Sequence, residues 1–361
     1  MKMFPALEKQ YSKDKKNVIE ALRYAHEIAF APVAFQVSRL MIKFGILQML
    51  ADAKNGLTMD EIVEKTRLSP YAVKVLLESS LTIGTILYTD ERFVVSKTGW
   101  FLISDPLVSV NLRFNHDVTY LGMYHMEEAL LNGKPEGLKV FGQWDTIYEG
   151  LSSLPAEAQK SWFDFDHFYS DNSFDEALEI VFSYAPLKLL DVGGNTGRWA
   201  LRCVDYNADV CVTIMDLPQQ LELMEKHISG KTGDDRIFGH GVNLLDKNEP
   251  FPEGFDAIWM SQFLDCFSEE EIISILKRAA ASMSESSNLF IMETFWDRQP
   301  NDVAAYCLTQ LSMYFTVMAN GNSKMYHSDD FIRCVEAAGL KVDKIYDSLK
   351  SGHSILVCKK K

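Results

Sequence analysis

The chain has 361 residues and a formal net charge of -14, from 36 basic and 50 acidic side chains. This acidic balance argues against broad affinity for nucleic acid or for anionic membranes, because both require Lys and Arg to neutralise phosphates. The composition, 47% hydrophobic and 24% charged, is ordinary for a soluble globular protein, and the length allows two domains, each with its own core.

Two features bear on the cellular compartment. Residues 1–16 contain no apolar stretch of the kind that a secretory signal requires, so none is predicted. The most apolar helical segment, residues 28–50, is interrupted by Gln36, Arg39 and Lys43, which favours a buried or interface helix over a membrane span. The six cysteines are scattered, without CxxC pairs or zinc-like Cys/His spacing, so we expect free thiols in a reducing cytoplasm.

The first 110 residues show the pattern of a winged helix. Residues 13–52 are predicted to be helical. Thr58 can cap a short helix, with a Glu three residues later completing a capping box. A second helix is predicted over 70–84, where Pro begins it and Gly ends it, and residues 87–96 alternate as a β-hairpin.

A winged helix either binds DNA or serves as a packing and dimerisation module. A DNA reader presents Arg, Lys, Asn or Gln from its second helix to base edges. Here the segment 70–84 offers Lys74 among mainly apolar residues and Glu78. Together with the acidic charge of the chain, this composition favours packing or dimerisation over DNA binding.

Residues 111–180 are predicted to form a helical connector rich in aromatic side chains. Most aromatic residues belong to a core, but a pocket for a flat substrate is also mostly apolar, with a few placed polar groups. The connector is therefore a candidate wall of a substrate pocket. Tyr169 and His125 are its candidate pocket residues, with a core or surface position as the alternative for each.

Strands and helices alternate over residues 181–361, which predicts an open, largely parallel sheet covered on both faces. One intervening helix begins at Ser268, with Glu271 completing its capping box. In such sheets ligands bind at the carboxyl ends of the strands. The predicted strands are 187–192, 208–215, 235–242, 255–261, 288–294, 340–349 and 353–359.

The stretch 187–218 carries the most informative motif. An apolar run ends at Asp191, a glycine-rich turn and a helical segment follow, and a second apolar run ends at Asp216. Glycines let a backbone approach a ligand, and an acid at the second strand end can accept from ribose hydroxyls. The glycines at 193, 194 and 197 do not have GxGxxG or P-loop spacing. A nucleoside without phosphates, such as S-adenosylmethionine, is therefore favoured.

In its block order and spacing, nearly the whole chain resembles the small-molecule O-methyltransferases, a family of class I S-adenosylmethionine-dependent enzymes. The resemblance implies a Rossmann-like sheet preceded by a mostly helical winged-helix domain that makes a homodimer. It also implies a small aromatic or polyketide-like substrate. The matching blocks are FDHFYSDNS (165–173), LLDVGGNTG (189–197), MDLP (215–218), FDAIWMSQFLDCFSEEE (255–271), IMETF (291–295) and ANGNSKMYHSDDF (319–331).

The same resemblance assigns cofactor-binding residues by position. Asp216 matches the ribose-binding acid, and Leu217 lies beside the adenine. Asn243 and Leu244 match the pair that holds and covers the adenine, although a simple loop turn is an equal alternative for Asn243. The remaining positions of the cofactor site are Ser173, Asp191, Gly193, Gly194 and Ser261.

The catalytic positions depart from the family pattern. Asp265 stands where the family has a His base, and Met325 stands in the substrate pocket where the family has a Glu. Glu293 matches the Glu that orients the His. If both carboxylates face one pocket, they share a proton and one pKa rises towards neutrality. The alternative for Asp265 is a cap or first-turn acid before the following helix.

Three readings of the chemistry remain open at this stage. In the first, Asp265 is the general base. In the second, transfer needs no strong base, because proximity suffices or because the substrate is already acidic. In the third, the chain binds the cofactor but performs altered chemistry or none. A winged-helix regulator is a fourth, weaker possibility. No metal site is expected, because no Asp, Glu and His cluster has ligand spacing.

Overall fold

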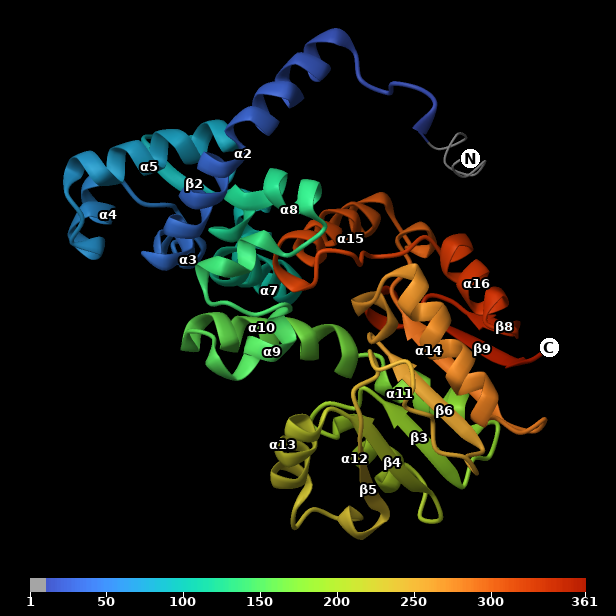
Figure 1. Cartoon of the computed structure of the whole chain (residues 1–361). Coiled ribbons are helices and arrows are strands. Elements are labelled where there is room, and N and C mark those ends of the chain that lie inside the picture. The colour runs from blue at the N-terminus through green and yellow to red at the C-terminus, as the bar shows by residue number, and fades with distance from the viewer. Residues whose placement is uncertain (1–10) are drawn as a thin grey trace. The chain divides into compact units, whose positions relative to one another are not determined.

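The computed structural model describes residues 11–361. The chain divides into two compact units, Met1–Leu112 and Arg113–Lys361, so the boundary lies two residues beyond the predicted one. The connector predicted at 111–180 belongs to the same compact unit as the sheet. Figure 1 labels the elements of both units.

The first unit consists of helices and a two-stranded wing. The stretch predicted to be helical, 13–52, contains two helices, because the chain turns at Gly45, whose φ is +72°. The described elements are α2 (Val18–Lys43), α3 (Ile46–Asp52), α4 (Met59–Thr66), α5 (Pro70–Ile83), β1 (Ile86–Thr89), β2 (Arg92–Val95), α6 (Lys97–Ser104) and α7 (Pro106–Phe114).

Local signals in the sequence account for these boundaries. Thr58 accepts a hydrogen bond from the Glu61 amide at the start of α4, as predicted. The wing turns at Asp90 and Glu91, both in the left-handed region, which matches the twist of a two-residue hairpin. The predicted helix-turn-helix and wing are confirmed. The core of this unit includes Met41, Ile46, Leu47, Ile62, Val73, Leu77 and Ile86.

The apolar α2 does not qualify as a membrane span. Within residues 11–361, no single helix has the length and apolarity to cross a membrane. Only α2 and α3 taken together, with a 60° bend between them, meet the requirement of length and composition.

The described residues of the second unit form a seven-stranded sheet in the order β5-β4-β3-β6-β7-β9-β8. The first five of these are parallel, and β9 runs antiparallel to both β7 and β8. This confirms the predicted largely parallel sheet. Its strands are β3 (Lys188–Val192), β4 (Cys211–Asp216), β5 (Ile237–Gly241), β6 (Ala257–Ser261), β7 (Asn288–Glu293), β8 (Leu340–Tyr346) and β9 (Ser354–Lys360).

Helices cover both faces of this sheet, because its inner strands are apolar on both sides. One face packs against α14 (Glu269–Ser282) and α16 (Ser328–Ala337). The other packs against α11 (Phe174–Phe182), α12 (Arg198–Tyr206) and α13 (Pro218–Ile228). The strand order reverses between β3 and β6, which opens a crevice at their carboxyl ends.

A third apolar cluster joins the connector to the segment after β7. It is rich in aromatic residues; Phe114 stacks on Phe165 with ring centroids 4.1 Å apart. Two ion pairs, Asp171 with Arg198 and Asp175 with Arg202, link the end of the connector to α12. The helices of this part are α8 (Met126–Asn132), α9 (Ile147–Gly150), α10 (Ala156–Asp171) and α15 (Asp302–Tyr314).

Candidate active site

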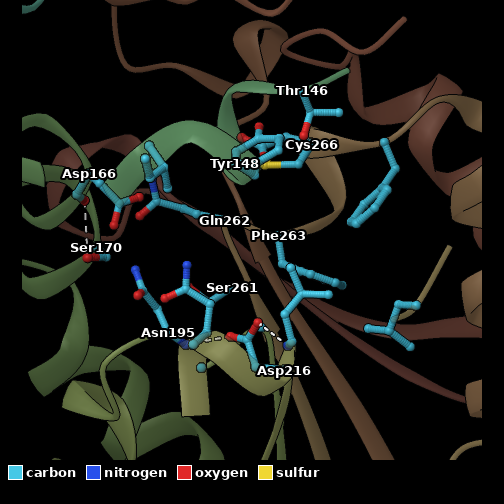
Figure 2. Close-up of a pocket in the computed structure, with 18 of the residues that line it drawn as sticks. Thr146, Tyr148, Asp166, Ser170, Asn195, Asp216, Ser261, Gln262, Phe263 and Cys266 are labelled. Carbon is cyan, nitrogen blue, oxygen red and sulfur yellow. Dashed lines mark hydrogen bonds between the residues drawn. The ribbon is translucent and has the colours of Figure 1, made fainter. Parts of the chain in front are cut away.

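A cavity of about 590 Å³ lies at the carboxyl ends of β3, β4 and β6. Loops that follow these strands and β5 line one end of it, and aromatic residues of the connector and of α15 line the other. In Figure 2, Asn195, Asp216 and Ser261 lie at one side of the cavity and Thr146, Tyr148 and Cys266 at the other.

The glycine-rich loop after β3 leaves no room for side chains. Gly193 has a φ of +73°, and a Cβ there would lie 2.3 Å from Cδ2 of Phe263. A Cβ on Gly194 would lie 2.5 Å from the Asp191 carboxylate. The loop therefore presents bare backbone to the cavity, as close approach of a ligand requires.

Asp216, at the end of β4, is oriented by two backbone amides. Its Oδ2 accepts from the Asn195 N–H at 2.9 Å, and its Oδ1 accepts from the Leu217 N–H at 2.7 Å. Burial raises the pKa of the Asp216 carboxyl, while these two hydrogen bonds lower it. The carboxylate also lines the cavity, where its remaining lone pairs can accept from ribose hydroxyls.

The surroundings of Asp191 show whether the cavity suits the predicted cofactor. Its side chain is buried, and Oδ2 has no hydrogen-bond partner among the described residues. Burial, reinforced by the charge of Asp216, raises its pKa to about 8. An unpartnered buried acid calls for a cationic or donor group from a ligand. Together with the bare loop and Asp216, it fits a nucleoside that carries an ammonium group.

Of the other predicted cofactor residues, four line the cavity and one does not. Leu217, Asn243, Leu244 and Ser261 all line the cavity. Asn243 also forms the loop turn named as its alternative, because its Oδ1 accepts from the Leu245 N–H at 3.0 Å.

Ser173 does not line the cavity. Its fully buried hydroxyl donates to the Lys350 carbonyl at 2.5 Å and contacts Nδ1 of His353 at 3.0 Å. It therefore fastens the loop before β9 and lies outside the site defined by the cavity.

Asp265 lines the cavity from a short turn between β6 and α14. It is 6% exposed and does not cap α14, whose first turn is capped by Ser268. Burial raises the pKa of Asp265 to about 6, against the opposing effect of hydrogen bonds from the Cys266 thiol and from backbone amides. The Cys266 Sγ lies 3.5 Å from Asp265 Oδ1. A carboxylate poised in this way can act as a general base near neutral pH.

Glu293, at the end of β7, is buried behind the cavity and does not line it. The prediction that both carboxylates face one pocket is therefore wrong for Glu293. Its Oε1 accepts from the amides of Phe263 and Leu264, at 3.1 and 2.9 Å, and so holds the turn that carries Asp265. Burial and the nearby Asp265 raise the pKa of Glu293 well above its usual range.

Of the three predicted substrate-pocket residues, Met325 alone lines the cavity. Tyr169 is buried against Phe165, with ring centroids 4.9 Å apart. His125 lies at the start of α8, where its Nδ1 is 3.4 Å from Glu128 Oε2. Neither residue lines the cavity, which agrees with the core or surface position that was the alternative for each.

Several cavity residues were missed in the sequence. Tyr148 belongs to the aromatic connector, and Asp166 and Cys266 lie in matching blocks, but no role was assigned to any of the three. Gln262 is in the left-handed region at φ 45°, and its buried Oε1 has no partner among residues 11–361. Backbone strain of this kind at a strand end is typical of functional sites, but it cannot be read from a sequence. Within the same residues, no group of His, Cys, Asp and Glu could hold a metal ion.

Comparison with known proteins identifies the two units. A sequence model described as the O-methyltransferase domain matches residues 124–341, and one described as the Dimerisation2-like domain matches residues 22–93. The L-tyrosine C(3)-methyltransferase of Streptomyces lavendulae is 22% identical over 86% of this chain and 85% of its own length. The acetylserotonin O-methyltransferase of Homo sapiens is 20% identical over 84% of this chain and 89% of its own.

Solved structures give the same fold. The S-adenosylmethionine-dependent methyltransferase SibL, in its apo form, has a TM-score of 0.71 and 20% identity, over 94% of this chain and 99% of that one. Human N-acetylserotonin methyltransferase in complex with S-adenosylmethionine has a TM-score of 0.65 and 16% identity, over 97% and 99% of the two chains.

The sheet order, the glycine loop and the strand-end acids define a class I methyltransferase fold. The chain belongs to the O-methyltransferase domain family, and its cofactor is S-adenosylmethionine. The predicted S-adenosylmethionine-dependent methyltransferase is thus confirmed, and nothing in the comparisons favours altered chemistry or DNA regulation.

Proposed function

We propose that this methyltransferase transfers a methyl group to a hydroxyl oxygen of a small aromatic molecule, with Asp265 as the general base. One observation carries the proposal: a single cavity joins the glycine loop and Asp216 to an aromatic chamber, and Asp265 lines it. Aromatic walls with a few polar groups suit a flat, hydroxylated substrate.

The cofactor would be held by Asp216 at its ribose, by Asp191 at its ammonium group and by the backbone of Gly193 and Gly194. Leu217, Asn243, Leu244 and Ser261 complete that end of the cavity. When bound, the cofactor supplies an electrophilic methyl group on a sulfonium.

The residues of this chain would align the acceptor and remove its proton. A phenol has a pKa near ~10, so at neutral pH it needs a base as it reacts. Asp265 is suited to this because its pKa of about 6 leaves it largely ionised at pH 7. Glu293 would act as a positioning residue by holding the amides that precede Asp265.

A deprotonated phenol is nucleophilic at its oxygen and also at the ring carbons beside it. The similar Streptomyces lavendulae enzyme is named as a C(3)-methyltransferase, whereas the human relative is named as an O-methyltransferase. The acceptor atom is therefore read directly from the product, by incubation of the protein with methyl-labelled cofactor and a phenol library. An O-methyl signal in the product NMR spectrum supports the proposal, and a C-methyl signal contradicts it while preserving the role of Asp265.

We further propose a homodimer formed through the first unit. The Dimerisation2-like match covers most of α2. In a single chain α2 exposes apolar side chains that a partner would cover, namely Val18, Ile19, Leu22, Ile28, Phe30 and Val33. Light scattering should give twice the chain mass, and Phe30→Glu should lower it. The free thiols of all six cysteines suit the reducing cytoplasm that we propose as its location.

A further inference from the structure

Acidic side chains greatly outnumber basic ones around the cavity. Arg198 is the only lysine or arginine among the residues that line it, over the described part of the chain, and it pairs with Asp171. The acids that line the cavity are Glu149, Asp166, Asp171, Asp191, Asp216, Asp265 and Glu271. The cavity therefore repels a carboxylate or phosphate on a substrate and attracts a cation.

Asp166 has no assigned role in methyl transfer. It comes from α10, at the aromatic end of the cavity, and Figure 2 shows it beside Ser170 of the same helix. Its closest ion-pair partner among the described residues is His167, with Nδ1 3.8 Å from Oδ2. Burial, followed by repulsion from the positive charge of Arg198, lowers the pKa of His167 and so disfavours its charged form.

Among the described residues, the only positive charge that lowers the pKa of Asp166 is that of Arg198, which is itself paired with Asp171. Burial is the main cause that raises its pKa to about 7, and the charges of Asp265 and Asp171 add to it. A half-buried carboxylate that lines a cavity without a paired cation is costly to the folded protein. A ligand ammonium would offset this cost by a charge-assisted hydrogen bond.

The walls beside Asp166 suit the same ligand. Trp162 and Phe165 line the cavity from the same helix, and Tyr314 lines it from α15. The Trp162 Nε1 donates to the Tyr314 hydroxyl at 2.7 Å, which fixes both rings. Aromatic faces attract cations as well as aromatic rings.

Resting on the proposed function, we infer that Asp166 is a specificity-determining residue that binds the protonated amine of an aromatic substrate. The substrate class is an aromatic amine with a ring hydroxyl as methyl acceptor. Asp166 would hold the ammonium at the aromatic end, while Asp265 acts on the hydroxyl nearer the cofactor.

Three catechols of matched shape test this inference. Dopamine is cationic, 4-ethylcatechol is uncharged and 3,4-dihydroxyphenylacetate is anionic. Calorimetry measures their dissociation constants with the protein saturated by S-adenosylhomocysteine. We expect dopamine to bind about ten- to a hundredfold more tightly than 4-ethylcatechol, as a hydrogen bond to a charged group implies. The anionic probe should bind more weakly than either.

Two variants assign this preference to one carboxylate. Asp166→Asn should reduce the dopamine preference to within about threefold, and in turnover it should raise the KM for the amine more than it lowers kcat. Asp164→Asn is the matched control, because Asp164 is on the same helix, does not line the cavity and pairs with Lys160 and Arg113. It should leave the preference intact.

Other outcomes overturn the inference. It fails if dopamine binds no better than the uncharged probe, if none of the probes binds, or if Asp166→Asn keeps the preference. It also fails if that variant weakens S-adenosylmethionine but not S-adenosylhomocysteine, because Asp166 would then face the sulfonium. If the wild-type protein does not bind S-adenosylhomocysteine, the proposed function itself fails, which separates the two.

Discussion

Replacing Asp265 by Asn keeps the size of the side chain and removes its ability to take a proton. A carboxyl with a pKa of about 6 is roughly nine-tenths ionised at pH 7 and one-tenth ionised at pH 5. If Asp265 is the base, kcat/KM of the wild-type protein rises with pH up to about 6 and then levels. Asp265→Asn should lower kcat by about 10²- to 10⁴-fold, the usual contribution of a general base, and abolish the acid limb.

The assay is transfer of labelled methyl at pH 5 to 8, with Glu293 variants as controls. Because Glu293→Gln keeps an acceptor oxygen for the Phe263 and Leu264 amides, it should keep the acid limb. Glu293→Ala instead leaves the Phe263 and Leu264 amides without an acceptor, at a cost of about 1–3 kcal/mol each. An Asp265→Asn variant that keeps more than a third of the activity, or the same pH profile, would refute the assignment of the base.

Three further predictions concern the cofactor end. Because the pKa of Asp191 is raised to about 8, the folded state binds more protons than the unfolded state between about pH 4 and 8, so stability falls as pH rises. Asp191→Asn should therefore stabilise the free protein by up to about 5 kcal/mol at pH 8, measured as a higher melting temperature, with little change at pH 4. A difference that does not vary with pH would contradict this. Asp216→Ala should weaken S-adenosylhomocysteine binding by about ten- to a hundredfold, followed by the fluorescence of the cavity tryptophans; unchanged affinity would remove it from the site. Gly193→Ala should abolish cofactor binding, because its Cβ would meet the Phe263 ring at 2.3 Å, whereas Gly230→Ala, with a similar φ of +75° and open space, should retain it.

The cofactor end was largely predictable from the sequence. Each of Asp191 and Asp216 closes an apolar run, and parallel strands bring their carboxyl ends to one edge of the sheet. The glycine spacing then fixes where the backbone must come close to a ligand. These signals are local and repeat along the chain, so they survive without any knowledge of tertiary packing.

The substrate end was not predictable in the same way, because it depends on how helices are rotated. On α10, Trp162, Asp166 and Ser170 recur every four residues and line the cavity, while Tyr169 packs against its neighbours. Aromatic residues occur on both faces of this helix, so their periodicity does not distinguish cavity from core. Ser173 was predicted to lie in the cofactor site, but its hydrogen-bond partners lie in a loop about 180 residues later. A contact between segments so far apart cannot be read from the sequence.

Three acids that line the cavity, Asp265, Asp191 and Asp166, differ in the hydrogen bonds that they receive, and this difference bears on their roles. Asp265 receives hydrogen bonds from the Cys266 thiol and from backbone amides, which hold its pKa at about 6 and keep it ionised before a substrate arrives. No hydrogen bond lowers the pKa of Asp191, which is about 8. The pKa of Asp166 is about 7, and only the charge of Arg198 lowers it. A base must be ionised in advance, whereas a cation-binding acid can lose its proton when the cation binds. Of these three acids, Asp265 alone receives hydrogen bonds and is equipped to accept a proton, whereas Asp191 and Asp166 are equipped to bind positive charge at either end.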